Sequence, residues 1–378
     1  SYTLFCYQRQ IYYICTEIQT TMRHQDGLLK TAAAIFLTAG TFFFSGCGGK
    51  DNGIEIVDLS GYEDGGMLTD RMLDSMAQEI RVIELSAGED LTVPVYPERV
   101  KFTADRIYVL DNQGPRKWQM LAFDSDGRLM QKIGRQGRGP GEYFVISDFA
   151  VAPDGSLWIN DAGMDNMLHY RSNLEYVDTY PAPYDLENME FLDNGEVLAQ
   201  ISHWDSSLVD IALTDTLFRI EGRRELLRYS HAPHPVYSFG DGSLCPTPDG
   251  YLHNHPIDPD VYLIDAGSGS ITRHYRLDLG HDALTYDDIA GLGDDDMRYI
   301  EIMKGHVYLS QILLLTDSLV IGQLMEYGES VYFLADRNSR TIYKSTSDNM
   351  GILSDCRNGW LISKVIPEKT EDHYKLVL

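Results

Sequence analysis

Residues 149–161 read Phe-Ala-Val-Ala-Pro-Asp-Gly-Ser-Leu-Trp-Ile-Asn-Asp, and the interpretation of the whole chain starts from this stretch. An Asp-Gly pair between two short hydrophobic runs is the strongest short-range signal of a β-hairpin. The same turn, hydrophobic strand and terminal aspartate occur at Arg106–Asp111 and Ser330–Asp336, with weaker copies at residues 195–201 and 251–264. The chain therefore contains an internal repeat of about 40 to 55 residues.

A repeat of this length with four short strands is typical of a β-propeller blade, which buries its faces only by packing against neighbouring blades. Strands do not alternate with long helices, which argues against a parallel α/β sheet. Short helices are expected only at residues 68–79 and 286–299. The sequence therefore predicts an all-β fold, a six-bladed β-propeller over residues 54–378. Its last copy is short of strands, so an N-terminal strand at residues 54–59 or 80–85 is expected to complete it and close the ring.

Residues 123–143, Phe-Asp-Ser-Asp-Gly-Arg-Leu-Met-Gln-Lys-Ile-Gly-Arg-Gln-Gly-Arg-Gly-Pro-Gly-Glu-Tyr, together with residues 149–161, resemble NHL-type repeats. More narrowly, they resemble the six-bladed β-propeller lipoproteins of Gram-negative gut-type anaerobes, in which Gly-Arg-Gly-Pro-Gly-Glu-Tyr recurs between the early blades. The resemblance is sharp over residues 105–161. It implies an NHL-like propeller and export to the cell envelope, and it implies no particular chemistry.

The N-terminal region has the pattern of a lipoprotein signal peptide at residues 22–46. Arg23 and Lys30 precede an uncharged run, residues 31–44, and Ser-Gly leads into Cys47. Fourteen residues of helix rise only about 21 Å, too short to cross a hydrocarbon core of about 30 Å, so a cleaved signal is favoured over a membrane span. The Ser-Gly-Cys sequence resembles a lipobox, which implies a lipid on Cys47.

Three further expectations follow from this interpretation. Residues 1–21 are interpreted as upstream sequence that is not part of the native protein, and residues 47–53 as a lipidated tether. Gly48 stands where an aspartate would signal retention in the inner membrane, so the outer membrane is favoured, with the periplasmic or surface-facing side left open. Export permits a disulfide between Cys245 and Cys356, although two separate small core residues are the favoured interpretation.

The charge balance limits the classes of partner. The chain has 57 acidic side chains against 31 basic ones, a formal net charge of −26. Nucleic-acid binding requires a basic surface, and docking onto anionic lipids requires a polybasic segment, so neither is expected. The membrane is expected as a partner only through the lipid, and the protein is expected to be a monomer.

Gly134–Tyr143, with the sequence Gly-Arg-Gln-Gly-Arg-Gly-Pro-Gly-Glu-Tyr, superficially resembles a phosphate-binding loop. However, Gly-Lys-Ser/Thr does not follow it, and the next segment is predicted to be a strand rather than a helix. Its glycines instead favour a tight passage between blades. Arg135 and Arg138 are candidates to clamp a carboxylate or sulfate ligand, together with Glu142 and Tyr143, and pairing with carboxylates of adjacent blades is the favoured alternative.

Two other groups of residues are candidate sites. Trp204 lies in a polar context and is a candidate for stacking on a sugar ring. His231, His234, His253 and His255 are candidate ligands for a divalent metal, which would need them to converge with a neighbouring blade. The prolines next to each histidine pair favour surface loops instead.

The sequence contains no Gly-x-Ser-x-Gly elbow and no recognisable nucleophile–base order, which favours a protein that is not an enzyme. The leading hypothesis is a lipid-anchored scaffold that binds a glycan, a peptide or a partner protein and needs no cofactor. The alternative is a metal-dependent lyase or lactonase at the mouth of the propeller channel.

Overall fold

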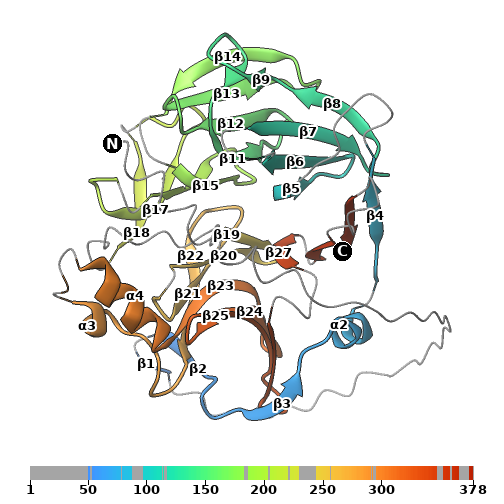
Figure 1. The fold of residues 1–378 in the computed structure, drawn as a ribbon. Helices are drawn as coiled ribbons and strands as arrows, with labels where there is room; N and C mark the ends of the chain where they lie inside the picture. Colours follow the sequence, from blue (N-terminus) through green and yellow to red (C-terminus); the bar gives the residue numbers. More distant parts are fainter. Residues whose placement is uncertain are drawn as a thin grey trace. The chain divides into compact units, whose positions relative to one another are not determined.

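The computed structural model describes a folded unit that begins at Gly49 and extends to the C-terminal strand (Figure 1). The described residues are 50–51, 53–77, 79–86, 97–112, 114, 117–182, 186–202, 205–219, 222–229, 244–255, 257–290, 292, 295–346, 352–357, 360–365 and 374–377. The predicted signal peptide and Cys47 therefore lie outside the described residues. Among those described, no helix has the length and apolar character needed to cross a membrane.

The fold is an all-β propeller, as the sequence predicts. Within the described part of the chain, five antiparallel sheets are each built from four consecutive strands. They are β5 (Pro97–Phe102) to β6 (Arg106–Asn112), β7 (Trp118–Asp124) and β8 (Leu129–Ile133); β11 (Ile146–Val151) to β12 (Leu157–Asp161), β13 (Asn166–Tyr170) and β14 (Tyr176–Pro181); β15 (Leu186–Phe191) to β16 (Val197–Ile201), β17 (Val209–Thr214) and β18 (Arg224–Arg228); β19 (Leu244–Thr247) to β20 (Gly250–Asn254), β21 (Asp260–Ile264) and β22 (Ile271–Asp278); and β23 (Val307–Leu315) to β24 (Leu319–Glu326), β25 (Glu329–Asp336) and β26 (Thr341–Thr346).

The hairpin turns predicted from Asp-Gly and Asn-Gly pairs are confirmed. Gly127, Gly155, Gly195 and Gly250 all have positive φ angles and follow an acidic or amide residue between two paired strands. Only glycine adopts this backbone region without steric cost, so these turns fix where each strand ends. The register of the sheets thus follows from local sequence.

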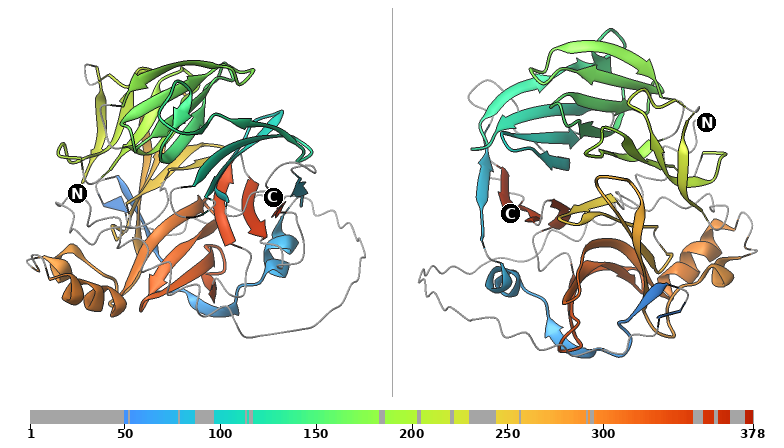
Figure 2. Two further views of the ribbon diagram at one scale, coloured as in Figure 1. Left: turned by 45° about the horizontal axis from the view of Figure 1, so that its top comes forward. Right: turned by 180° about the vertical axis from the view of Figure 1, so that it is seen from behind.

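An N-terminal segment, residues 54–85, adds outer strands to sheets formed much later in the chain; we call it the N-terminal strap. Its strand β2 (Ile54–Asp58) pairs in parallel with β22, and β3 (Glu63–Met67) pairs in parallel with β26. These blue strands lie along the outer edges of the orange sheets in both views of Figure 2. Strand β1 (Lys50–Asp51) pairs with β2, and α2 (Asp70–Met76) follows β3. Ion pairs at 2.6 Å (Glu55–Arg337) and 3.0 Å (Asp58–Arg340) fasten the strap to the turn after β25.

The last strand of the strap, β4 (Val82–Leu85), pairs antiparallel with β29 (Tyr374–Val377). Strands β27 (Ile352–Arg357), β28 (Trp360–Val365), β29 and β4 form one sheet. The sequence offers residues 54–59 and 80–85 as alternatives for a strand that completes a C-terminal sheet. Both segments contain strands, and they join different sheets.

The core lies between neighbouring sheets. Trp158 of β12 is 5% exposed, and its ring stacks on that of His169 at a centroid distance of 4.1 Å. The same indole packs against Phe191 and Phe218 of the following sheet. Such aromatic contacts bury large apolar areas and hold adjacent blades together. Cys245 is also buried, as the core interpretation predicts, and its thiol donates to the carbonyl of Leu313; the side chain of Cys356 lies outside the described residues.

Helices in the described chain begin in the two predicted regions, and the second region contains two short helices, the later of which extends beyond residue 299. Besides α2, α3 (Tyr286–Ile289) and α4 (Asp296–Lys304) lie between β22 and β23. The side chains of Thr285 and Asp288 form a capping box at the start of α3. This insertion packs on its own small cluster around Tyr299 and Met303.

Because several tyrosines are buried, we expect the stability of the folded protein to fall at alkaline pH. Burial raises the pKa of Tyr143 and Tyr262 from 10.0 to about 12, and it also raises the pKa of Tyr170, Tyr229 and Tyr308. Because the folded protein favours the neutral phenol, this stabilisation is complete below pH 10 and is lost as the pH rises from 10 towards 12. Phenolate absorbance and circular dichroism should therefore change together above pH 10; full ionisation near pH 10 with an unchanged circular dichroism spectrum would contradict the prediction.

Candidate functional site

A buried network of charges joins the innermost strands of three sheets. Lys101 on β5 is 5% exposed, and its Nζ lies 3.3 Å from Asp148 Oδ2 and 2.9 Å from Glu190 Oε1. The same ammonium donates to the carbonyl of Met189 at 3.0 Å, and the Met189 N–H donates to Asp148 Oδ2 at 2.7 Å. Arg99 adds an ion pair with Asp148 at 3.3 Å. The network thus links the three sheets through buried ion pairs, of which each is costly to break by removing one partner.

The predicted metal-binding histidines are only partly brought together. The His253 ring is fully buried on β20, with Nε2 2.7 Å from Asp210 Oδ2. Burial opposes the charge on Asp210, but the attraction and hydrogen bond of His253 outweigh it and lower the pKa of the carboxyl. His255 lies just beyond the strand, with its ring edge-on to Tyr229 and its Nδ1 3.4 Å from the Tyr286 hydroxyl.

His231, His234 and Trp204 lie outside the described residues. Within the residues that are described, there is no group of three or more His, Cys, Asp or Glu side chains placed to hold a metal ion. The metal site and the Trp204 stacking position therefore stay predictions. Of the described pair, His253 contacts the Asp210 carboxylate, and His255 contacts the rings or hydroxyls of Tyr229 and Tyr286. Both histidines lower the pKa of Asp210.

The glycine-rich loop at 134–143 is occupied by one of its own side chains. The carboxylate of Glu142 accepts the backbone N–H groups of Arg138 at 2.9 Å and Gly139 at 2.8 Å, and it pairs with Arg135 at 2.6 Å. A Cβ on Gly137 would lie 2.0 Å from Glu142 Oε2, so this carboxylate fills the space that the glycines leave. The hydrogen bonds from Gly139 and Arg135 lower the pKa of Glu142.

Three of the four candidate ligand residues in this loop thus interact locally. Arg135 pairs with Glu142, and the Arg138 guanidinium lies 5.2 Å from the centroid of the Phe144 ring. Tyr143 is completely buried, and its hydroxyl accepts the N–H of Met120. The loop thus binds the carboxylate of its own Glu142, which favours a structural role over ligand binding. The ion pair of Arg135 lies within this loop, whereas the sequence favoured pairing with a carboxylate of an adjacent blade.

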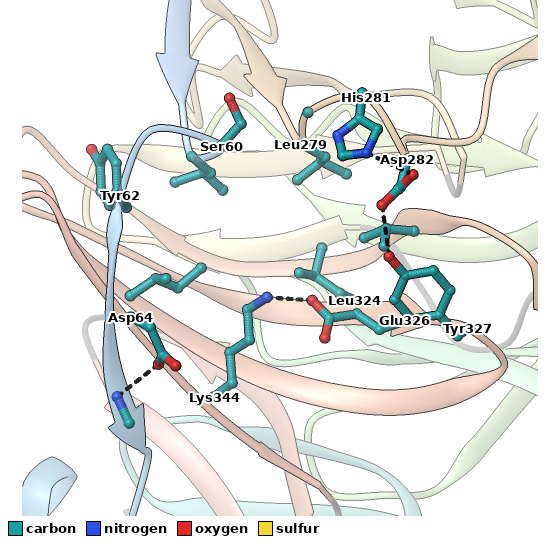
Figure 3. A pocket seen from close by; sticks show the side chains of 15 residues that line it. Ser60, Tyr62, Asp64, Leu279, His281, Asp282, Leu324, Glu326, Tyr327 and Lys344 are labelled. Atoms are coloured by element: carbon teal, nitrogen blue, oxygen red, sulfur yellow. Dashed lines mark hydrogen bonds and ion pairs between the residues drawn. The ribbon is translucent and has the colours of Figure 1, made fainter.

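A pocket of about 620 Å³, open to solvent, lies between the sheet of β19–β22 and that of β23–β26 (Figure 3). The strap crosses it with Ser60, Tyr62 and Asp64. Its apolar lining comes from strands and connections of both sheets, namely Leu59, Leu279, Val307, Leu324 and Ile342.

The polar side chains stand at the rim of this pocket. Figure 3 shows Tyr62 and Tyr327 at opposite sides, with Lys344 paired to Glu326 between them. The Tyr327 hydroxyl donates to Asp282 Oδ2 at 2.8 Å, which links the turn after β24 to the segment after β22. Sequence reasoning missed this site because its residues come from five separate segments. The one local signal is a tyrosine directly before Gly328 in a two-residue hairpin loop.

Sheet topology and the contacts between successive sheets define the class of this protein as an all-β propeller. The chain belongs to the family described as "Domain of unknown function (DUF4934)", whose sequence profile matches residues 67–373. No curated protein matches the chain.

Solved structures resemble this chain at low sequence identity. A putative exported protein from Bacteroides fragilis aligns with a TM-score of 0.65 and 17% identity, covering 85% of this chain and 99% of that one. A member of the DUF4221 family from Bacteroides vulgatus has a TM-score of 0.44 and 10% identity, over 80% of this chain and 96% of that one. A virginiamycin B lyase from Staphylococcus aureus has a TM-score of 0.39 and 11% identity, over 79% and 99%. The first of these likenesses supports the propeller fold.

Proposed function

We propose that this protein is an exported, lipid-anchored binding module of the cell envelope, in which a propeller presents the pocket of Figure 3 to a ligand. The observation that carries the proposal is the pocket itself, whose volume of about 620 Å³ falls within the range of about 300–1,000 Å³ for small-molecule sites. Its lining combines apolar side chains with a few polar groups, as such sites do. A glycan, a peptide or a segment of a partner protein fits this description.

The proposed scaffold is a six-bladed, NHL-like ring closed by the strap, with β27–β28–β29–β4 as its sixth blade. The antiparallel pairing of β4 with β29 supports this proposal, as do contacts of β27 with β23 and β5. Ser86, just after β4, exchanges hydrogen bonds at 2.9 Å with Gly127 and Leu129 of the β5–β8 sheet. A Cβ on Gly127 would lie 2.3 Å from the Glu84 carbonyl oxygen, so the strap is in close contact with that sheet.

The anchor is proposed at Cys47, with the protein in the outer membrane. The signal-peptide pattern at residues 22–46 supports it, and so does the exported protein from Bacteroides fragilis with the same fold. Replacing Cys47→Ser should move the protein from the membrane fraction to the soluble fraction and abolish palmitate labelling. Unchanged membrane association of this variant would reject the anchor.

Binding is tested with the chain from residue 48 onward, in a thermal-shift screen of mono- and oligosaccharides and short peptides. A compound that binds the pocket should raise the midpoint of thermal unfolding. Ser60→Trp, which places a large side chain at the pocket wall, should weaken binding at least about tenfold. Asn173→Trp, in the exposed turn before β14, is the matched control and should leave binding unchanged. If no compound binds, or if both variants bind equally, the pocket is not the functional site.

A further inference from the structure

We infer that the pocket between the strap and the β23–β26 sheet binds a neutral sugar ring, held between Tyr62 and Tyr327. This inference rests on the proposed binding function and names the chemical class of its ligand. The argument has three parts: the distribution of apolar and polar groups in the pocket, the backbone of Tyr327, and the charge at the rim.

The lining is apolar at the floor and hydrogen-bonding at the rim. Side chains of Leu279, Leu324 and Ile342 provide apolar contact, and the carboxylates of Asp64 and Asp282 are among the lining groups. A pyranose has the same division, because its ring faces carry C–H groups and its edge carries hydroxyls. Aromatic rings pack against such C–H faces, and carboxylate oxygens accept hydroxyl donors strongly. One oxygen of Asp64 accepts the N–H of Gly66, and Asp282 accepts the Tyr327 hydroxyl, so the remaining carboxylate lone pairs at this exposed rim are available to sugar hydroxyls.

Tyr327 lies in a turn whose backbone conformation is unfavourable for a tyrosine. β24 ends at Glu326 and β25 begins at Glu329, and the two loop residues, Tyr327 and Gly328, have φ angles of 53° and 87°. Two positive φ angles in a two-residue hairpin are the signature of a type I′ turn, for which Asn-Gly is the preferred sequence. A tyrosine there costs conformational energy, and strain of this kind is concentrated at ligand-binding positions.

The ring of Tyr327 also lacks the burial that would compensate this strain. The residue is 56% exposed, and its hydroxyl is held by Asp282 at 2.8 Å, which directs the ring to the pocket rim. On the opposite side, Tyr62 is half-buried, with the Arg340 guanidinium 5.0 Å from its ring centroid. Tyr62 is therefore held by Arg340, which also pairs with Asp58 of the strap. Tyr327 presents an exposed aromatic ring on the other side of the pocket (Figure 3).

The charge at the rim selects against anionic sugars. Asp64, Asp282 and Glu326 contribute three carboxylates to the pocket lining. The ammonium of Lys344 is paired with Glu326, and the His281 ring lies 3.2 Å from Asp282 Oδ1, so both basic groups of the lining already face a carboxylate. A uronic acid or a phosphorylated sugar would bring another negative charge close to these groups. The pocket is therefore expected to prefer uncharged hexoses and N-acetylhexosamines.

Isothermal titration and saturation-transfer NMR on the chain from residue 48 onward test the inference, with methyl glycosides of neutral hexoses and N-acetylhexosamines as probes and methyl glucuronide as the acidic comparison. At least one neutral glycoside should bind, and the glucuronide should bind at least about tenfold more weakly. Tyr62→Ala and Tyr327→Ala should each weaken binding about tenfold or more. Tyr327→Phe keeps the ring and loses the bond to Asp282 that orients it, so it should weaken binding less than Tyr327→Ala does. Met130→Ala, at an exposed position on β8, is the control.

Tyr327→Asn separates a binding role from a structural one. It creates the preferred Asn-Gly turn, so the variant should unfold at a higher temperature while losing sugar binding. A lower unfolding temperature would show that Tyr327 serves the fold, and would overturn the inference. If short peptides bind the pocket and no neutral glycoside does, the proposed binding function is supported and the sugar inference is wrong. If nothing binds, both are wrong.

Discussion

Replacing Lys101→Met is expected to lower the free energy of unfolding by about 3–5 kcal/mol. The substitution leaves two carboxylates, Asp148 and Glu190, buried without the ammonium that lies within 3.3 Å of one and 2.9 Å of the other. Asp148 keeps its ion pair with Arg99, and Glu190 loses its ion pair with Lys101. Methionine preserves the length and apolar stem of the side chain, so the loss measures the charge network. Chemical denaturation gives the value.

The control for this prediction is Lys132→Met on β8. Lys132 is exposed, and the same change of charge there should alter stability by no more than about 0.5 kcal/mol. Adding Glu190→Gln to Lys101→Met should recover part of the loss, because it removes one of the two buried carboxylate charges whose ion pair with Lys101 is lost. Equal midpoints for the Lys101 and Lys132 variants would show that the network does not stabilise the fold.

Gly250→Ala is the second substitution with a large expected effect, a loss of about 3 kcal/mol. Gly250 begins β20 with a φ angle of 131°, and an added Cβ would lie 2.1 Å from the carbonyl oxygen of Ile264. The carbonyl oxygen belongs to the backbone of the paired strand, so the contact is relieved only by moving β20 away from β21. His253 lies three residues along the same strand, and its contact with Asp210 should be weakened as well. Thermal unfolding and the histidine NMR signals report the two effects.

Gly195 offers the matched control for backbone strain alone. Its φ angle is 85°, and an added Cβ would meet no atom within 4 Å. Gly195→Ala should therefore cost only about 1–2 kcal/mol, the cost of the left-handed conformation. If both alanine variants lose the same stability, the close approach to Ile264 contributes nothing and the prediction is wrong.

The fold could be predicted from the sequence because its determinants are local. Asp-Gly and Asn-Gly pairs such as those ending in Gly127, Gly155 and Gly195 place the hairpins, and the structure gives each glycine a positive φ angle. Strand ends, and hence the repeat, follow from these turns. The propeller class needs no long-range information beyond the repeat itself.

The pocket and the charge network could not be predicted because they depend on register between distant strands. Lys101, Asp148 and Glu190 each look like ordinary charged residues within a strand, and only the packing of three sheets brings them together. The role of Glu142 as the acceptor inside its own glycine loop could not be predicted either. The glycines indicate a tight turn, but they do not indicate which side chain fills the space beside them. Tyr327 alone carried a local signal, in its position before Gly328.

The strap has a consequence for how the chain acquires its structure. Glu55 and Arg337, which form an ion pair, are 282 positions apart in the chain, and β2 and β3 find their parallel partners in β22 and β26. These N-terminal strands can therefore pair only after most of the chain has been made, and contacts at such separation make folding slow. Docking of the strap is thus expected to be a late step in folding.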